Sequence, residues 1–219
     1  MDRNAVTFAR EFIRQPQVVA SFIPSSRNLA RRMVAPIPQS GQPVVVELGP
    51  GTGAFTEVIQ EALAGRGTHI AVELNERFST MLGQRFPGVD VVTADARNVV
   101  SVLHDLGLGH ADVVVSGLPW ALFVPDRQRS ILDGVIGSLC PDGSYTTFAY
   151  LHALWTSPAR RFRRLLNERF EEVVLGRTVW SNFPPALVYH CRRPRRSFPE
   201  RRTSTAISSH LAEVAEVVH

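Results

Sequence analysis

Hydrophobic residues along the chain follow two alternating patterns. Short, nearly continuous apolar runs rich in valine and isoleucine are typical of parallel strands that are covered on both faces. Between them lie longer segments in which apolar residues recur every three or four positions, as on one face of a helix. The predicted strands are 44–46, 69–73, 89–95, 111–116, 143–150, 171–180 and 187–191, and the predicted helices are 55–63, 76–86, 96–106, 125–139 and 158–170. This alternation predicts an α/β fold: a doubly wound, mostly parallel, seven-stranded sheet with helices on both faces.

Two further helices are predicted before the first strand, at about residues 4–15 and 28–34. In the first of them Phe8 and Phe12 lie one turn apart, while arginines fall toward another face. Such a helix can lie on a membrane surface, close over a substrate cleft, or pack against the core, and the sequence leaves these roles open. The predicted organisation is an N-terminal helical lid or surface segment (1–40), a core (41–193) and a basic, flexible tail (194–219).

The first strand runs into a glycine-rich turn, Glu47-Leu48-Gly49-Pro50-Gly51-Thr52-Gly53, and a helix follows. Glycines at such a turn allow backbone angles that other residues avoid, and they let a ligand approach the main chain. A strand, a glycine turn and a helix in this order favour a nucleotide-type ligand at the helix N-terminus. A dinucleotide fingerprint would have its third glycine at position 54, where this chain has Ala54. The pattern is therefore one residue shorter than that fingerprint.

This shorter pattern resembles the first motif of the class I S-adenosylmethionine-dependent methyltransferases, which have a Rossmann-like fold. Glu73 ends the second predicted strand and can accept hydrogen bonds from both hydroxyls of a ribose. Asp95 ends the third and can accept one from an adenine amino group. The expected cofactor is thus S-adenosyl-L-methionine. The predicted cofactor-binding residues are Glu47, Gly49, Gly51, Thr52, Gly53, Glu73, Leu74, Asp95, Ala96, Ser116 and Gly117.

The end of the fourth predicted strand, Ser116-Gly117-Leu118-Pro119-Trp120, is the second place where chemistry is expected. Ligands of parallel sheets lie beyond the carboxyl ends of the central strands. The catalytic candidates are Ser116 and Tyr150, to orient the nucleophile, and His152, to accept its proton. Each has a plainer alternative, as a turn residue, a core aromatic and a surface histidine respectively. The predicted substrate-binding residues are Phe22, Ser25, Ser26, Leu118, Pro119, Trp120, Tyr150 and Trp180, with packing as the alternative role of both tryptophans.

Three stretches resemble the bacterial phospholipid N-methyltransferases that methylate phosphatidylethanolamine: 23–30 (IPSSRNLA), 116–119 (SGLP) and 179–189 (VWSNFPPALVY). The resemblance covers residues 10–193 and implies N-methylation of the amine of a lipid headgroup. The related rRNA adenine dimethylases share the glycine turn but carry asparagine where this chain has Gly117. The amide that would accept from a flipped adenine is therefore absent here.

Other methyl acceptors remain open at this stage. The aromatic stretches 120–123 and 150–155 suit a planar acceptor as well as an acyl chain, and function follows from the site rather than from the fold. The main alternative is a tailoring methyltransferase for a small aromatic or amine metabolite, as in natural-product biosynthesis. Further alternatives are an rRNA adenine methyltransferase and an S-adenosylmethionine-binding protein without turnover. Nucleic acid is the least expected partner.

The basic residues are all arginine, 24 in number, and they are unevenly distributed. The net charge is +4 over residues 1–40, −6 over 41–150 and +6 over 151–219. Basic flanks around an acidic core suit an anionic surface, either phospholipid or nucleic acid. A genome composition biased toward arginine would give the same usage without any such partner.

Composition also bears on the location and on metals. No apolar run approaches the roughly 20 residues needed to span a bilayer. The N-terminal stretch also contains charged residues at positions where a signal peptide would be continuously apolar. Cys140 and Cys191 give no disulfide framework, and seven scattered histidines offer no metal site. The predicted location is the cytoplasm, with peripheral contact at the inner membrane face if the acceptor is a lipid.

Overall fold

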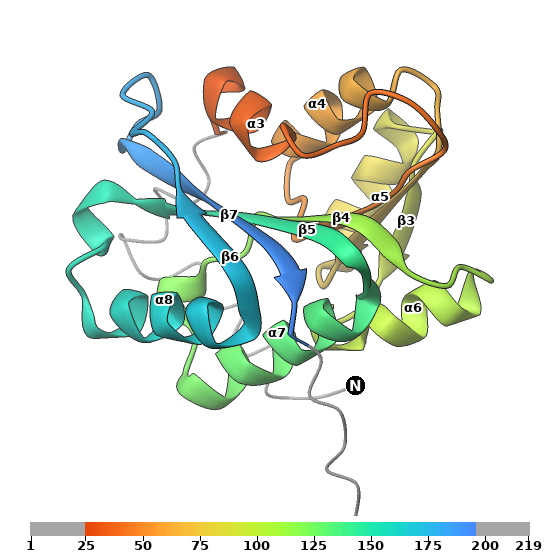
Figure 1. The fold of residues 1–219 in the computed structure, drawn as a ribbon. Helices are drawn as coiled ribbons and strands as arrows, with labels where there is room; N and C mark the ends of the chain where they lie inside the picture. The colour runs from red at the N-terminus through yellow and green to blue at the C-terminus, as the bar shows by residue number, and fades with distance from the viewer. Residues whose placement is uncertain (1–24, 196–219) are drawn as a thin grey trace, which may run out of the picture.

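The computed structural model describes residues 25–195, in which a seven-stranded sheet forms the centre of the molecule (Figure 1). Its strands are β1 (Val44–Leu48), β2 (Thr68–Glu73), β3 (Asp90–Thr93), β4 (Ala111–Ser116), β5 (Leu139–Tyr150), β6 (Phe170–Leu175) and β7 (Ala186–Pro194). Their order across the sheet is β3-β2-β1-β4-β5-β7-β6. The first five pair in parallel, whereas β7 is antiparallel to both β5 and β6. The predicted Rossmann-like, mostly parallel sheet is confirmed.

Helices cover both faces of this sheet, as predicted (Figure 1). On one face lie α3 (Arg27–Met33), α4 (Ala54–Leu63) and α5 (Glu76–Arg85), and on the other α6 (Val99–Asp105), α7 (Pro125–Ser138) and α8 (Ser157–Arg169). Short 3-10 turns, η1 (Ala96–Asn98), η2 (Trp120–Leu122) and η3 (Leu151–Ala153), follow β3, β4 and β5. Ser26, Asn75 and Thr156 cap α3, α5 and α8 by accepting from backbone N–H groups of the first turn.

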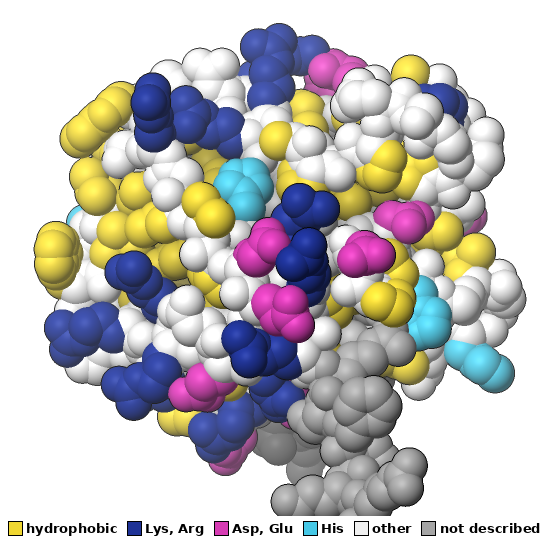
Figure 2. Space-filling view, viewed as in Figure 1, with side chains coloured by type: hydrophobic (Ala, Val, Ile, Leu, Met, Phe, Trp, Pro, Cys, Tyr) yellow, Lys and Arg dark blue, Asp and Glu magenta, His cyan; other side chains and the backbone are white. Residues whose placement is uncertain are grey.

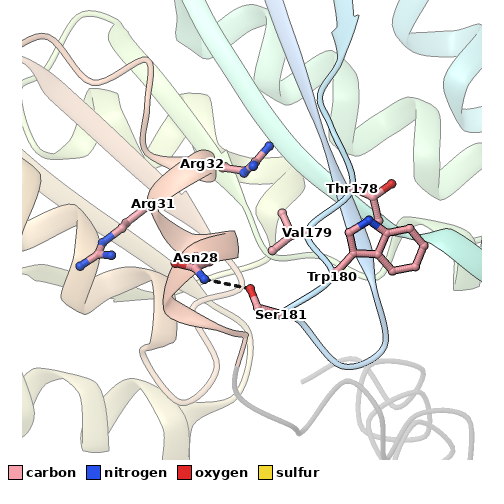
Figure 3. Close-up of a pocket in the computed structure, with 7 residues that line it drawn as sticks. All are labelled: Asn28, Arg31, Arg32, Thr178, Val179, Trp180 and Ser181. Carbon is pink, nitrogen blue, oxygen red and sulfur yellow. Dashed lines mark hydrogen bonds between the residues drawn. The ribbon is translucent and has the colours of Figure 1, made fainter.

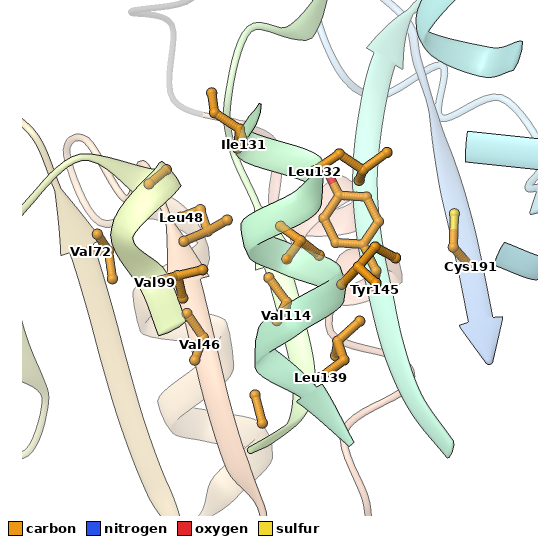
Figure 4. Close-up of a cluster of buried hydrophobic side chains, with 14 of the residues drawn as sticks. Val46, Leu48, Val72, Val99, Val114, Ile131, Leu132, Leu139, Tyr145 and Cys191 are labelled. Atoms are coloured by element: carbon orange, nitrogen blue, oxygen red, sulfur yellow. The ribbon is translucent and has the colours of Figure 1, made fainter. Parts of the chain in front are cut away.

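Two hydrophobic clusters join the sheet to its helices. Because successive strand residues point to opposite faces, Val46 and Leu48 pack toward α6 and α7, whereas Val45 packs toward α3 and α4. Figure 4 shows the larger cluster, in which Leu132 of α7 lies close to Tyr145 of β5. Each fully buried valine or leucine side chain contributes roughly 1.5–3 kcal/mol. Burial on both faces explains why the strands appear in the sequence as unbroken apolar runs.

One predicted strand is too long. The strand predicted at 171–180 ends at Leu175, and residues 176–185 form a connection that we call the acceptor loop. Regular pairing of β6 with β7 stops where Leu175 meets Tyr189. The returning segment contains Pro184 and Pro185, which lack the N–H that a ladder requires. Sequence alternation alone therefore overestimated this strand.

A second strand begins earlier than predicted. β5 starts at Leu139, directly after α7, rather than at residue 143. Leu139 pairs with Ala111 of β4, and the regular register resumes only at Ser144 opposite Val113. The intervening residues, which include Pro141 and Gly143, form an irregularity within the strand. Their turn-like composition explains why the sequence favoured a later start.

The helix predicted at 28–34 is present as α3, and its Leu29, Ala30 and Met33 are buried in the cluster it shares with α4. The helix predicted at 4–15, the predicted contact Phe22 and the tail from residue 196 lie outside the described residues. No helix of the described part is both long and apolar enough to cross a bilayer.

Candidate active site

The glycine turn between β1 and α4 leaves its backbone open to a ligand. Gly51 has a φ of +56°, in the left-handed region, and a Cβ at this position would meet no atom within 4 Å. Its N–H donates to Glu73 Oε2 at 3.1 Å, so the turn is tied to the end of β2. Open main chain of this kind lets a ligand come close to backbone donors. The turn therefore fits the predicted cofactor.

Glu73 is held in one orientation by two backbone donors. Its Oε1 accepts from the Asn75 N–H at 2.8 Å, and its Oε2 accepts from Gly51. Burial raises the pKa of the Glu73 carboxyl above its ordinary value, and the backbone donors oppose that shift. An oriented carboxylate beside the glycine turn is a suitable acceptor for a pair of ribose hydroxyls. Leu74, also predicted to bind the cofactor, is exposed next to it.

Asp95 forms a charged cluster with two arginines just after β3. It accepts from the Arg97 N–H and from Arg97 Nη2, both at 3.0 Å, and from Arg127 Nη2 at 3.3 Å. Burial alone would raise the pKa of Asp95, but the Arg97 hydrogen bonds and the Arg127 charge outweigh it and lower the pKa. The carboxylate is therefore ionised at neutral pH and available as an acceptor. Ala96, its predicted neighbour in the site, is buried at the start of η1.

Glu47 lies inside the protein, beneath α4. Thr56 Oγ1 donates to its Oε2 at 2.7 Å, and His69 Nε2 lies 3.3 Å from the same oxygen. No hydrogen bond to its Oε1 is formed within the described residues. The carboxylate thus links β1 to α4 and β2, and its contact with the cofactor stays a prediction. Sequence reasoning missed Thr56 and His69, because polar residues within regular elements give no sign of their partners.

The turn after β4 is organised by buried side chains. Ser116 Oγ accepts from the Leu118 N–H at 3.4 Å and from Trp120 Nε1 at 3.1 Å. The Trp120 ring stacks on Phe162 of α8 with 4.2 Å between ring centroids, and only 3% of the residue is exposed. Trp120 therefore packs in the core, which was its alternative role. Ser116, also buried, positions the turn that carries Leu118 and Pro119.

Gly117 stands where no side chain fits. Its N–H donates to Leu48 O at 2.9 Å, and a Cβ would lie 2.8 Å from Gly49 O, a backbone atom. The Leu118 side chain lies over Gly49 as well, because a Cβ there would be 2.7 Å from Leu118 Cδ2. The turn after β4 therefore packs directly against the glycine turn, and the predicted donor and acceptor segments meet at this edge of the sheet.

A buried asparagine joins the segment before α3 to the acceptor loop. Asn182 Oδ1 accepts from the Ser26 N–H at 2.8 Å, and its Nδ2 donates to Pro184 O at 2.7 Å. Ser25 and Thr52 line one hollow of about 340 Å³, so Ser25 and Ser26 lie between the glycine turn and the acceptor loop. Asn182 is 4% exposed and was missed as a site residue. Its presence in the stretch 179–189 was the signal that could have identified it.

Tyr150 and His152 lie at the end of β5, where the chain turns through η3. Their rings stack with 5.7 Å between centroids and 11° between planes. The Leu151 N–H donates to Pro185 O at 2.8 Å, which ties this turn to the acceptor loop. Burial raises the pKa of the Tyr150 hydroxyl, so the group stays protonated at neutral pH. These two catalytic candidates thus lie together beside the acceptor loop, while Ser116 is buried below the neighbouring turn.

Trp180 is placed apart from the other predicted substrate residues. It is 73% exposed and borders an open hollow of about 540 Å³ between α3 and the acceptor loop (Figure 3). Asn28 Nδ2 donates to Ser181 Oγ at 2.9 Å across that hollow. The two predicted tryptophans therefore occupy different environments, one in the core and one on the surface. Within residues 25–195, no group of three His, Cys, Asp or Glu side chains could hold a metal ion.

The sheet order, the open glycine turn after β1 and the carboxylate at the end of β2 are those of a class I S-adenosylmethionine-dependent methyltransferase. The ornithine lipid N-methyltransferase of Singulisphaera acidiphila is 35% identical to it over 196 residues, which are 87% of this chain and 97% of that protein. The chain therefore belongs to the same family of S-adenosylmethionine-dependent methyltransferases as that enzyme. Family membership sets aside the alternative of a binding protein without turnover.

Two further comparisons agree with this class. A ribosomal RNA small subunit methyltransferase A from Chlorobium luteolum is 27% identical over 118 residues, 51% of this chain and 41% of that protein. The solved structure of human methyltransferase-like protein 13 in complex with SAH matches with a TM-score of 0.57. That match has 16% identity and covers 87% of this chain and 90% of the other, so it shows the fold alone. No protein-family profile matches the chain.

Proposed function

We propose that this enzyme N-methylates the headgroup amine of a membrane lipid, with S-adenosylmethionine as the methyl donor. The observation that carries the proposal is the 35% identity with a lipid N-methyltransferase over nearly that protein's whole length. Large apolar side chains exposed around the turns after β4 and β5, including Leu122 and Trp155, support it, since they suit an acyl chain. The proposed location is the cytoplasm, with peripheral contact at the inner membrane face.

The residues divide the task between holding the donor and preparing the amine. The donor, when bound, supplies a methyl group already activated by its sulfonium, so the protein contributes alignment and exclusion of water. Glu73 and the Gly51 backbone hold the ribose side, and Asp95 accepts from the adenine amine. Leu118, packed on the glycine turn, keeps water from the approach path.

The acceptor amine must be neutral to attack and must lose a proton as it is methylated. The Tyr150 hydroxyl oxygen accepts from an amine N–H, which leaves the nitrogen lone pair free for the methyl group. His152, stacked on that ring, accepts the released proton. This assignment gives Ser116 a positioning role, because its hydroxyl is buried between Trp120 and the turn.

Two other acceptors can be weighed against a lipid. An adenine base of RNA is disfavoured, because the position where related dimethylases carry asparagine is Gly117, and a Cβ there would lie 2.8 Å from a backbone oxygen. A small planar amine is the second candidate. The parallel rings of Tyr150 and His152 form a flat surface on which such a ring could stack.

The test is a transfer assay with isotopically labelled S-adenosylmethionine. The full chain is incubated with lipid extract in detergent micelles, with a panel of aromatic and amine metabolites, or with RNA. Label recovered in an amine-bearing lipid is the expected result, and the same lipid with its amine acylated should accept none. Gly51→Arg, which fills the open side of the glycine turn, is the inactive control. If label is found only in a soluble metabolite, the lipid proposal is rejected and the acceptor is a small planar amine.

A further inference from the structure

The hollow between α3 and the acceptor loop is lined by hydrogen-bond donors. Its lining residues are Asn28, Arg31, Arg32, Thr178, Val179, Trp180 and Ser181, none of which is acidic. Figure 3 shows Arg32 extending from α3 toward the side of Thr178, with Trp180 on the acceptor loop opposite the helix. Guanidinium, amide and hydroxyl groups around one hollow are suited to the oxygens of an anion.

Three arginines of this region have no acidic partner among residues 25–195. Arg27, at the start of α3, pairs with Glu57 and Glu61 of α4. Within residues 25–195, by contrast, Arg31, Arg32 and Arg177 form no ion pair; Arg32 Nη1 donates only to the carbonyl oxygen of Arg177, at 3.2 Å. Burial and then the charge of Arg32 lower the pKa of nearby His190. Among the described residues, positive charge is therefore concentrated here without acidic groups to balance it.

Exposed aromatic side chains stand next to this charge. Trp180 is 73% exposed and Phe183, three residues along the acceptor loop, is 77% exposed. Figure 2 shows basic and hydrophobic side chains side by side over α3 and the neighbouring strands β6 and β7. Tryptophan beside arginine is typical of surfaces that lie at the interface of a bilayer, where the ring meets the headgroup region and the guanidinium meets phosphate.

The same loop forms one wall of the acceptor side. Asn182, between Trp180 and Phe183, accepts from the Ser26 N–H. Pro185, two residues after Phe183, accepts from the Leu151 N–H beside the catalytic candidates Tyr150 and His152. A bilayer that contacted the loop would therefore lie next to the turn that carries Tyr150 and His152.

We propose that the hollow and the acceptor loop form a membrane-docking site within the folded core. Arg31, Arg32 and Arg177 bind the phosphates of anionic phospholipids, and Trp180 and Phe183 enter the interfacial layer. The proposal rests on the proposed function, since docking beside the acceptor entrance serves an enzyme whose acceptor lies in a bilayer. The site consists of described residues only.

The experiment measures sedimentation of the full chain with vesicles of phosphatidylglycerol and phosphatidylcholine, and with vesicles of phosphatidylcholine alone. Anionic vesicles should bind the wild type, and binding should weaken as salt rises. The double variant Arg31→Gln/Arg32→Gln should bind them at least tenfold more weakly, on the basis of about fivefold per basic residue. Arg129→Gln/Arg164→Gln removes the same charge from exposed positions on the opposite face and should stay within about twofold of wild type.

Aromatic insertion is tested with Trp180→Ser/Phe183→Ser, which should reduce vesicle binding and reduce the shift in tryptophan fluorescence that vesicles cause, to which exposed Trp155 also contributes. Glycerol 3-phosphate in solution tests the other source of the same phosphate chemistry and should leave vesicle binding unchanged. If it displaces the vesicles, or binds the wild type but not the arginine variant, the hollow is a site for a free phosphate and the docking proposal is overturned. Equal vesicle binding by wild type and both test variants would also overturn it.

The docking result is separable from the proposed function. Transfer to a lipid dispersed in nonionic detergent does not need an anionic bilayer, so the arginine variant should keep the wild-type rate there while losing rate on anionic vesicles. If the wild type methylates the dispersed lipid but the variant loses nothing on vesicles, docking is wrong and the function stands. Loss of vesicle binding in the variant, without lipid methylation by the wild type, would uphold docking and reject the lipid acceptor.

Discussion

The two halves of the active edge are built differently. Over β1, β2 and β3, the predicted donor side consists of open backbone at Gly51 and of carboxylates held by hydrogen bonds at Glu73 and Asp95. Over β5 and β7, the proposed acceptor side consists of stacked rings and of a loop that exposes Trp180 and Phe183. A donor shared by the whole class needs one fixed set of contacts, whereas an acceptor defines the particular enzyme. We therefore expect the hydrogen-bonded side to reflect the chemistry of the class and the exposed side to select the substrate.

The largest effect is expected from Glu73→Ala, which alters the donor side alone. The variant loses the carboxylate that we expect to accept from two ribose hydroxyls. Hydrogen bonds to a charged group contribute roughly 1.5–3 kcal/mol, so S-adenosylmethionine should bind about 100-fold more weakly. Calorimetry measures this affinity. Glu76→Ala, an exposed glutamate at the start of α5, is the matched control. Equal losses in the two variants would contradict the role of Glu73.

The next effect concerns the junction of the two halves. In Gly117→Ala the new Cβ meets Gly49 O at 2.8 Å and must push two backbone segments apart. Such overpacking costs about 1–3 kcal/mol in the free energy of unfolding, and the displaced geometry should lower turnover about 30-fold. Gly109→Ala is the control, because a Cβ there meets nothing within 4 Å. Urea denaturation and kcat are measured for both, and unchanged turnover in Gly117→Ala would refute the close contact.

A smaller effect should be confined to the acceptor side. Asn182→Ala leaves the Ser26 N–H and the Pro184 carbonyl without their partner, and an unpaired buried polar group costs about 1–3 kcal/mol. The acceptor loop should loosen and the KM for the acceptor rise about tenfold, while donor affinity is unchanged. Asn167→Ala, an exposed residue of α8, provides the comparison. A parallel loss of donor affinity would mean that the two halves are not independent.

The smallest effect is on the pH dependence of stability. The pKa of Asp95 is lower in the folded protein than its ordinary value of 3.8, so the ionised group stabilises the folded state above that value. This contribution is lost as the pH falls through the lowered folded pKa. The difference in unfolding free energy between wild type and Asp95→Asn should therefore be constant near neutrality and shrink below pH 3.8. A difference that does not change on acidification would show that Arg97 and Arg127 do not stabilise the carboxylate.

The mostly parallel sheet and its covering helices could be predicted because their signal is local, in apolar runs that alternate with helical periodicity. The glycine turn and the acids at or just after the ends of β2 and β3 were found in the same way, from the order of elements, and their contact with the donor stays a prediction. The acceptor side depends on contacts between distant segments. Asn182 bonds to Ser26, 156 residues away, and no local pattern announces that pairing.

The size and hydrophobicity of a side chain also do not tell whether it is buried in the core or exposed on the surface. From the sequence, Trp120 and Trp180 are equivalent candidates for lining a pocket, yet one stacks on Phe162 in the core and the other is largely exposed. The difference comes from Ser116 and α8, which enclose Trp120, and from the acceptor loop, where pairing with β7 is reduced to an isolated bridge at Val179 and the next residue, Trp180, is exposed.

The position of β7 has a consequence for how the protein is made. β7 is the last strand of the described part of the chain but lies between β5 and β6 in the sheet. During synthesis, strands β1 to β5 can pair with one another as soon as residue 150 has emerged. The acceptor wall has to wait until residue 194 is available, and until then the free edge of β5 is open to pairing with other chains. Chaperone dependence on the ribosome should therefore be greatest in the interval between these two points.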